Sequence, residues 1–462
     1  MAGQIEHMEL LEQLEQLLRQ GDTPALTSFL DEQNISIVAE WIDEFPDYAA
    51  RILSALSVHR AASTFKILDT PIQRDVIHEL PPYKTAELLN ELPADDRTSL
   101  LEELPSEVVK ELIRLLDPEE RKITLELLGY EEDSVGRLMT PDYIAVFKDW
   151  TVQEVLEHIR TFGKDSETID VIYVIDESGK FIDDIRIREF LLADPDKHVS
   201  DMIDGRYITL NVNDDQSMAN EVFKMNNRVA LPVVDDNNVL LGIVTIDDVL
   251  WVANEEFSED MQLMGGTEAL DLPYLETPFF SLYKKRIGWL VVLFLGELLT
   301  ATAMGFFEGE IKKATLLALF IPLIISSGGN SGSQAATLII QALAVGDITL
   351  NDWWRIMRRE ILSGLALGAA LGIVGFFRIA IWQSIGGTYG PHWQEIGLVV
   401  GISLVGVVLW GTISGSMLPL ILKRLGADPA VSSAPFIATL VDVTGLVIYF
   451  SVAYFFLHGI ML

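Results

Sequence analysis

The chain has 462 residues, too many for one ordinary core, so several domains are expected. It contains no cysteine, which excludes disulfides and thiolate metal sites. The net charge of −35 is uneven: residues 1–286 hold 59 of the 68 acidic and 25 of the 33 basic residues, a net −34, whereas residues 287–462 carry a net −1. A strongly acidic half is thus joined to a nearly uncharged apolar half, and an acidic surface repels nucleic acid and attracts cations.

The first part of the chain reads as a series of short helices. Its N-terminus has neither the basic flank nor the apolar run of a signal peptide, so membrane entry is expected from the C-terminal half. Four leucines recur every twelve residues, each before a helix start marked by proline and first-turn acids: Leu80, Leu92, Leu104 and Leu116. Residues 1–138 are therefore predicted to form an acidic, all-α superhelical domain. It is most simply a scaffold, although its acidic turns can also face a partner domain.

Residues 139–199 and 200–254 look like two copies of one α/β unit. Each has a β-branched strand, a polar turn, a second strand and a helix, as in "VIYVIDESGKFIDDIRIREFLL" and "ALPVVDDNNVLLGIVTIDDVLWV". The pair resembles tandem CBS domains, a regulatory module. The second copy has the module's motif at Gly242, Thr245 and Asp248, while the first copy lacks the Gly and Thr. The resemblance implies ATP as a candidate ligand of the second copy; the alternative is a purely structural, dimerising pair.

Residues 255–284 are predicted to connect the two halves. The first part reads as a helix that Gly265 and Gly266 end. One face of that helix is acidic, with Glu255, Glu256, Glu259 and Asp260.

Residues 285–462 are predicted to form an α-helical transmembrane domain of five helices. Each apolar segment exceeds the roughly 20 residues that a span needs, and the segments lie near 287–307, 314–346, 361–385, 396–422 and 430–458. Basic clusters at 284–286, 355–359 and 423–424 fall on one side of five spans, which should be cytoplasmic. Lys312 and Lys313 lie on the other side, offset by Glu308 and Glu310. The chain is thus expected in the cell inner (plasma) membrane, with cytoplasmic N-terminal domains and an external C-terminus.

The second span contains an unusual polar stretch, "IISSGGNSGSQAATLII" at residues 324–340. As a straight helix, this span would be about 50 Å long against a hydrocarbon core of about 30 Å. Pro322 and the glycines are predicted to break it, and non-helical backbone at that depth requires protein or a wet cavity around it. The stretch is therefore predicted to line an aqueous path, with Asn330 and Gln334 offering amides. The alternative is close helix packing through small residues.

Two acids lie deep within spans, and a buried carboxylate marks an ion path, a proton relay or an ion pair. Asp442 is predicted to face the path, because small and hydroxyl residues such as Ala438 and Thr439 surround it. For Glu297 a structural role is favoured, either paired with Arg378 or protonated.

The cargo is expected to be a hard divalent cation. Mg²⁺ keeps several waters and uses only one or two carboxylates, and a symmetric dimer would present two Asp442 side chains at a shared axis. Soft metals prefer Cys, Met or His, and none of the seven His lies in a pair with ligand spacing. No nucleophile–base pair or phosphate loop is found, so an enzyme is not expected.

These features together resemble the MgtE family of magnesium transporters and channels over essentially the whole chain, above all "PLIISSGGNSGSQAATLI" and "PFIATLVDVTGLVIYFSVA". The resemblance implies a homodimer whose second and fifth spans line one pore. By motif position, Asp442 matches the pore aspartate and Ala438 a backbone-carbonyl position near the ion. The glycine-asparagine signature is matched by Gly328, Gly329, Asn330, Gly332 and Gln334, with Thr439 also expected to line the pore. One departure is Ala434, where some members carry Asn.

The resemblance also implies gating by cytosolic Mg²⁺, which acts as cargo and regulator. At high Mg²⁺ the acidic faces are held together and the pore is closed; at low Mg²⁺ they repel. The residues hypothesised to sense Mg²⁺ are Asp248, Glu255, Glu256, Glu259 and Asp260, with Asp95 and Asp96 opposite. The alternatives are the same architecture carrying Mn²⁺ or Co²⁺, or a nucleotide-sensing receptor without ion flux.

Overall fold

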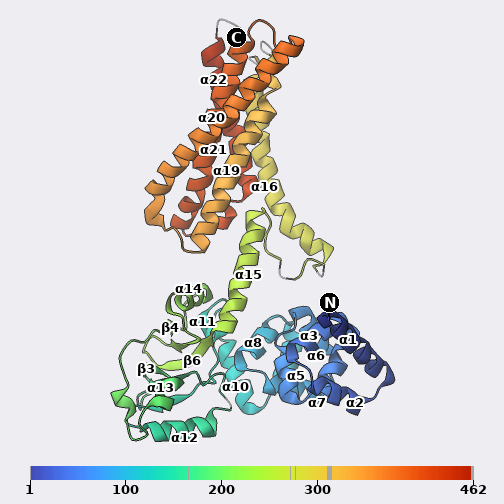
Figure 1. Ribbon diagram of the computed structural model, residues 1–462, viewed down its shortest axis with the longest axis vertical. Coiled ribbons are helices and arrows are strands. Elements are labelled where there is room, and N and C mark those ends of the chain that lie inside the picture. The colour runs from blue at the N-terminus through green and yellow to red at the C-terminus, as the bar shows by residue number, and fades with distance from the viewer. Residues whose placement is uncertain (1, 165, 271, 276, 310–314, 459–462) are drawn as a thin grey trace. The chain divides into compact units, whose positions relative to one another are not determined.

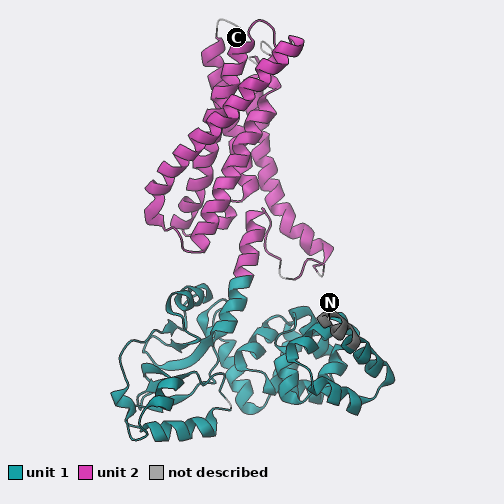
Figure 2. Ribbon diagram, viewed as in Figure 1, with its two compact units in different colours: residues 1–254 teal, residues 255–462 magenta. Residues whose placement is uncertain are grey.

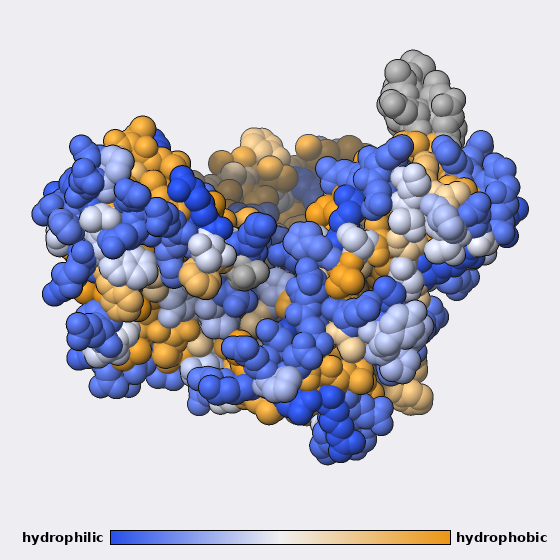
Figure 3. Space-filling model, turned by 90° about the horizontal axis from the view of Figure 1, so that it is seen from below, coloured by the Kyte–Doolittle hydropathy of each residue, from blue (hydrophilic) through white to orange (hydrophobic). Residues whose placement is uncertain are grey.

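The computed structural model describes residues 2–164, 166–270, 272–275, 277–309 and 315–458, with side chains from Leu10 onward. The chain divides into two compact units, residues 1–254 and 255–462 (Figure 2). Glu310, Lys312 and Lys313, which enter the charge argument, lie outside the described residues. Hydrophilic residues cover much of the face drawn in Figure 3, with hydrophobic residues among them.

Short helices form the first part of unit 1, as the sequence predicts (Figure 1). They are α1 (Ala2–Gln20), α2 (Thr23–Asp31), α3 (Ile35–Glu44), η1 (Pro46–Tyr48), α4 (Ala49–Ala55), α5 (Val58–Phe65), α6 (Thr70–Glu79), α7 (Pro82–Glu91), α8 (Ala94–Glu102), α9 (Ser106–Leu115), α10 (Pro118–Leu127) and α11 (Val135–Leu138). The helices α7 to α10 start exactly twelve residues apart. The repeated leucines stand at or just beyond the helix ends and are all buried, because each one closes the core beneath the turn.

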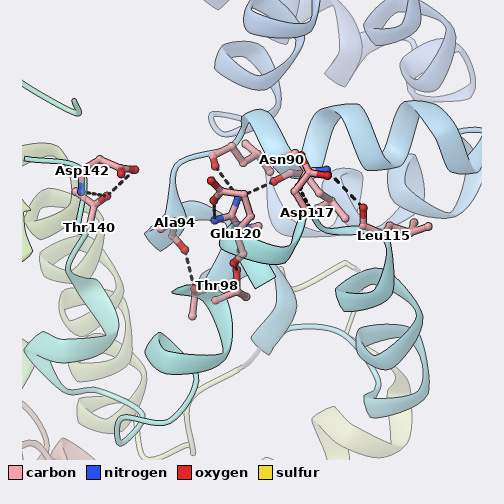
Figure 4. A network of polar contacts seen from close by, with 12 residues as sticks. Asn90, Ala94, Thr98, Leu115, Asp117, Glu120, Thr140 and Asp142 are labelled. Carbon is pink, nitrogen blue, oxygen red and sulfur yellow. Dashed lines mark hydrogen bonds and ion pairs between the residues drawn. The ribbon is translucent and has the colours of Figure 1, made fainter. Parts of the chain in front are cut away.

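A buried arginine holds two of these helices together, and Figure 4 shows its partner Glu120 in the surrounding network of polar contacts. Arg97 of α8 is fully buried, donates to the carbonyls of Leu89 and Leu92 at 2.9 and 3.2 Å, and donates to the Thr124 hydroxyl at 2.9 Å. It also forms an ion pair with Glu120 of α10. A buried charge is tolerated only when its hydrogen bonds are satisfied, and here they fix the position of α8.

The second part of unit 1 contains two sheets of identical topology. Their strands are β1 (Ala145–Phe147), β2 (Val171–Ile175) and β3 (Phe181–Arg186), then β4 (Leu210–Asn211), β5 (Ala230–Val234) and β6 (Leu240–Thr245). In each sheet the first two strands are parallel and the last two antiparallel. The helical elements beside them are α12 (Val152–Phe162), α13 (Ile187–Leu192), η2 (Val199–Asp201) and α14 (Gln216–Asn226). This repetition confirms the predicted duplication.

The helix α15 (Ile246–Met264) is longer than the predicted connecting helix. It begins directly after β6, so the helix expected at the end of the second copy and the connecting helix are one continuous element. It ends before Gly265 and Gly266, as predicted, and Gly266 has a φ of +76° that favours glycine. Leu263 and Met264 pack against the core of the membrane helices.

Five helices of unit 2 are long and apolar enough to span a membrane, which agrees with the predicted number for the described residues. The helical elements are α16 (Phe279–Phe306), α18 (Thr315–Ala318), α19 (Ile321–Ala344), η3 (Leu350–Asp352), α20 (Trp353–Gly386), α21 (Trp393–Arg424), η4 (Pro429–Val431) and α22 (Ala434–Leu457). Figure 1 shows α19, α20, α21 and α22 running lengthwise beside one another.

The predicted break at the glycines is wrong. The whole polar stretch lies inside the continuous helix α19, and Pro322 stands in its first turn, where proline is tolerated. The interruption instead precedes Pro322, between α18 and α19. Glycine weakens an isolated helix, but here close packing holds the stretch helical: a Cβ added at Gly415 of α21 would lie 2.0 Å from the Gly332 carbonyl oxygen.

Candidate functional site

A cavity of about 410 Å³ lies between three of the membrane helices. Four of the predicted site residues line it, namely Asp442, Ala438, Asn330 and Gly329. Asp442 and Ala438 are one turn apart on α22. Asn330 follows Gly329 on α19, and a Cβ added at Gly329 would lie 3.5 Å from Ala438. Because Gly329 has no side chain, α19 and α22 approach closely, and this approach places the amide and the carboxylate around one space.

Four other predicted residues do not line this cavity. Gly328 and Gly332 are packing positions: an added Cβ would lie 2.4 Å from Val407 and 2.7 Å from Ile437, respectively. The alternative of small-residue packing therefore holds for these two glycines. The Thr439 hydroxyl donates to the Pro435 carbonyl at 3.0 Å, and the Thr439 methyl group faces α16. Gln334 is exposed on α19. Residues three or four apart share a helix face, so neighbours in the signature point to different sides.

Four further lining residues were not among the predicted site residues, namely Thr300, Pro322, Ile325 and Ser326. Ser326 stands one turn before Asn330, so helical spacing from Asn330 identifies it once the stretch is known to be helical. Thr300 belongs to α16, the first span, which was not predicted to line the aqueous path. The hydroxyl oxygen of Thr300 is buried and makes no hydrogen bond within the described part of the chain.

Glu297 is placed differently from the expected ion pair. Its carboxyl group lies beside that of Asp442 and interacts with it. Arg378 instead donates to the Tyr389 hydroxyl at 3.2 Å, and its guanidinium lies 5.1 Å from the centre of the Trp382 ring. The two deep acids therefore adjoin each other, and the first span contributes to the surroundings of Asp442.

Unit 1 contains a second charged site, which we call the acidic cluster: Asp95, Asp96, Glu167, Asp247 and Asp248, gathered around Lys66. The Lys66 ammonium lies 3.6 Å from Asp96 and 4.0 Å from Glu167. Asp95 and Asp96 occupy the first turn of α8, where the helix dipole favours negative charge. The structure thus brings Asp95 and Asp96 together with Asp248, as hypothesised from the sequence.

Burial and mutual repulsion make this cluster a poor place for five free carboxylates. Asp95 is 6% exposed, and one of its oxygens has no hydrogen-bond partner among the described residues. Burial, then Asp248 and Asp96, raise the pKa of Asp95 well above its usual value. Burial also raises the pKa of Asp248 to about 7. For Lys66, burial acts to lower the pKa, but the surrounding carboxylates outweigh it and the net shift is upward. The cluster therefore favours an added cation.

The remaining predicted sensing residues lie further along α15, in unit 2. Glu255 and Glu259 are exposed, and Glu256 and Asp260 are half-buried. The pKa of Asp260 is raised by burial and then by Asp428, which lies between α21 and α22. Asp428 was missed, because its position before a proline marks only a turn in the sequence. The five predicted residues thus divide between two places along one helix.

The predicted nucleotide motif is engaged internally. The Thr245 hydroxyl is 2.5 Å from Asp248 and 2.6 Å from Asp247. Gly242 is required by packing, since an added Cβ would lie 2.7 Å from the Thr140 carbonyl oxygen. Asp248 belongs to both the motif and the acidic cluster.

Within the described ranges, no group of three or more His, Asp and Glu side chains is arranged to hold a metal ion.

Comparison with known proteins agrees with this architecture. The family of divalent cation transporters named MgtE matches residues 321–452, the MgtE intracellular N domain matches residues 33–133, and CBS domains match residues 135–196 and 199–255. The chain is 40% identical to the magnesium transporter MgtE of Thermus thermophilus over 331 residues, 72% of each protein. It is 30% identical to that of Bacillus subtilis over 453 residues, 98% of each.

Two solved structures are similar to unit 1. One is the cytosolic domain of the Mg²⁺ channel MgtE in complex with ATP, with a TM-score of 0.51 and 34% identity over 52% of this chain and 99% of that one. The other is the soluble part of a magnesium transporter, with a TM-score of 0.51 and 25% identity over 54% of this chain and 99% of that one. The chain is therefore a transporter rather than an enzyme, a multi-pass membrane protein with an intracellular N domain, and it belongs to the MgtE family of magnesium transporters.

Proposed function

We propose that two copies of this chain form a Mg²⁺ uptake pathway that cytosolic Mg²⁺ closes. The observation that carries this proposal is the shared cavity of Asp442, Ala438, Asn330 and Gly329. The lining of the cavity includes one carboxylate, one amide and the hydroxyl residues Thr300 and Ser326. Hydrated Mg²⁺ binds such oxygen ligands, whereas softer metals prefer nitrogen or sulfur.

The position of the cavity supports a homodimer. Pro322, Ser326 and Asn330, which line it, are exposed in the single chain. A polar cavity that opens at the side of a membrane helix bundle must be covered, because lipid cannot satisfy its polar groups. A second copy related by a twofold axis covers it and supplies a second Asp442. The number of basic residues at the ends of the spans favours an external C-terminus.

Gating is assigned to the acidic cluster and α15. Mg²⁺ bound near Asp95, Asp96 and Asp248 neutralises their repulsion and holds α8 against the start of α15. The same continuous helix carries Glu255, Glu256, Glu259 and Asp260 and ends against the membrane core at Met264. When Mg²⁺ leaves, the carboxylates repel one another and this end is released.

ATP is proposed as a second regulator at Gly242, Thr245 and Asp248 of unit 1. The ATP-bound cytosolic domain of a similar channel supports this assignment. Because Asp248 also belongs to the acidic cluster, ATP and Mg²⁺ binding there should be coupled. Calorimetric titration of the full chain with ATP should show binding that Thr245→Val weakens about tenfold, as for loss of a hydrogen bond to a charged group; binding that ignores this change contradicts the site.

The function is tested by Mg²⁺ flux into proteoliposomes that contain the full chain. Wild type should conduct, and Asp442→Asn, which removes the charge but keeps shape and hydrogen bonding, should lower the flux at least tenfold. Competition with Mn²⁺ and Co²⁺ measures whether another divalent cation is preferred. If wild type gives no flux, the chain is better described as a receptor whose spans only dimerise.

A further inference from the structure

The helix α16 packs tightly against α22 beside Asp442. A Cβ added at Gly296 would lie 2.6 Å from the Thr439 methyl, so only glycine allows this approach. About two turns before Gly296 on the same helix, the Trp289 indole donates to the Ser433 hydroxyl at 3.1 Å. Glu297 follows Gly296 directly, and this packing places its carboxyl group in contact with that of Asp442.

A second feature of α16 points into the cavity. Thr300 stands three residues after Glu297, on the same helix face, and lines the cavity with Asp442 and Asn330. Its hydroxyl oxygen is buried and has no hydrogen-bond partner in the described residues. Buried hydroxyls are almost always satisfied, so this one calls for a water or an ion's hydration shell in the cavity.

We propose that Glu297 and Thr300 make α16 part of the cation-binding site, with Glu297 as a second carboxylate beside Asp442 and Thr300 as a ligand of the cation's water shell. This inference rests on the proposed function. Two carboxylates in contact within a membrane are mutually repulsive unless a cation or a proton lies with them. Mg²⁺ uses one or two carboxylates and retains waters, and the threonine hydroxyl and Asn330 amide then bind those waters.

The surroundings of Glu297 disfavour a purely structural ion pair. Arg378 of α20, the partner expected from the sequence, is engaged with Tyr389 and Trp382. The cavity beside Asp442 is lined by hydroxyl, amide and small side chains as well as by Pro322 and Ile325. Hydroxyl and amide groups in such a wall are typical of a hydrated path.

The test compares the external Mg²⁺ dependence of flux in proteoliposomes for wild type, Glu297→Gln, Glu297→Asp and Thr300→Val. Glu297→Gln should raise the half-saturating Mg²⁺ concentration roughly tenfold, the loss expected for one charge-assisted contact. Glu297→Asp should recover part of it, and Thr300→Val should raise it about threefold through a lost hydrogen bond. Glu360→Gln, a carboxylate of α20 away from the cavity, is the matched control and should match wild type.

Each outcome decides the proposal. If Asp442→Asn loses flux while Glu297→Gln and Thr300→Val both keep the wild-type half-saturation, the inference is overturned and the proposed function stands. If wild type itself gives no flux, the proposed function is rejected. Should Glu297→Gln fail to elute as a single species in detergent, the Glu297→Asp and Thr300→Val curves decide, because aspartate keeps the charge and valine keeps the shape of threonine.

Discussion

The ammonium group of Lys66 lies 3.6 Å from the Asp96 carboxylate and is the positive centre of a cluster that holds five acids. It neutralises only part of their charge. In the absence of Mg²⁺, this one lysine joins α5, which ends at Phe65 beside it, to the acidic turn of α8. The Mg²⁺ of the proposed gating would therefore act on the same carboxylates as Lys66.

Lys66→Gln should destabilise the soluble unit by roughly 1–2 kcal/mol at low Mg²⁺, because a half-buried cation is removed from among carboxylates. Mg²⁺ should restore most of the loss, since it replaces the missing charge. The measurement is the temperature at which the full chain loses protease resistance, with and without Mg²⁺. Lys84→Gln is the control: Lys84 pairs with a single carboxylate, that of Glu87 one turn away on the same helix, at 2.9 Å. Its loss should be about 0.5 kcal/mol or less and independent of Mg²⁺.

The acidic cluster should make the stability of unit 1 depend on pH. The folded-state pKa of Asp248 is raised to about 7 from an unfolded value near 3.8, and that of Asp95 is raised as well. Between these values the folded state binds more protons than the unfolded state, so stability should fall as pH rises through this window. Protons and Mg²⁺ then compete. Half-maximal protease protection should need less Mg²⁺ at pH 8 than at pH 6, and Asp248→Asn should reduce this difference. A pH-independent midpoint in wild type would contradict the assignment.

Neutralising the five predicted sensing residues together should abolish Mg²⁺ protection of the full chain from protease, since each of the two places along α15 loses negative charge. The substitutions are Asp248→Asn, Glu255→Gln, Glu256→Gln, Glu259→Gln and Asp260→Asn. The matched control neutralises five exposed acids of the helical repeats, namely Glu107, Glu111, Asp117, Glu119 and Glu126. The control set should leave Mg²⁺ protection from protease unchanged. If the two sets of substitutions have the same effect, the assignment of the Mg²⁺-sensing residues is refuted.

Gly415→Ala should destabilise the membrane bundle by about 1–3 kcal/mol, because its methyl group would meet the Gly332 carbonyl oxygen at 2.0 Å and force α19 and α21 apart. Gly305→Ala, near the end of α16 with no atom within 4 Å of the added Cβ, should be neutral or slightly stabilising. The comparison is made by thermal aggregation of the full chain in detergent. A Gly415→Ala protein as stable as wild type would show that the two helices separate easily.

The sequence predicts the elements whose pattern is local. The twelve-residue spacing of buried leucines, the duplicated strand–turn–strand–helix units and five long apolar segments all appear in the structure. These patterns are reliable because each one reflects burial of a single face or the thickness of a bilayer. The pairing of Asp95 and Asp96 with Asp248 was predicted from a family resemblance. These residues lie far apart in the chain, and no local pattern of the sequence indicates that they meet.

The polar stretch of α19 shows where local reasoning fails. Glycine has low helix propensity, and this led to the predicted break. Propensity is outweighed here because Gly328 and Gly332 let α21 and α22 pack at backbone distance. Which glycine faces a neighbour and which faces a cavity depends on the packing partners, and those cannot be read from spacing on one helix.

The amino-acid sequence alone determined the acidic and apolar halves, the repeated units and the choice of Asp442 as the pathway carboxylate, because charge, periodicity and a costly buried acid are properties of the chain itself. Only the tertiary structure decided that Glu297 adjoins Asp442 instead of Arg378, and that Thr300 shares the cavity with Asn330. These contacts join helices far apart in the chain, and side-chain packing between helices selects them.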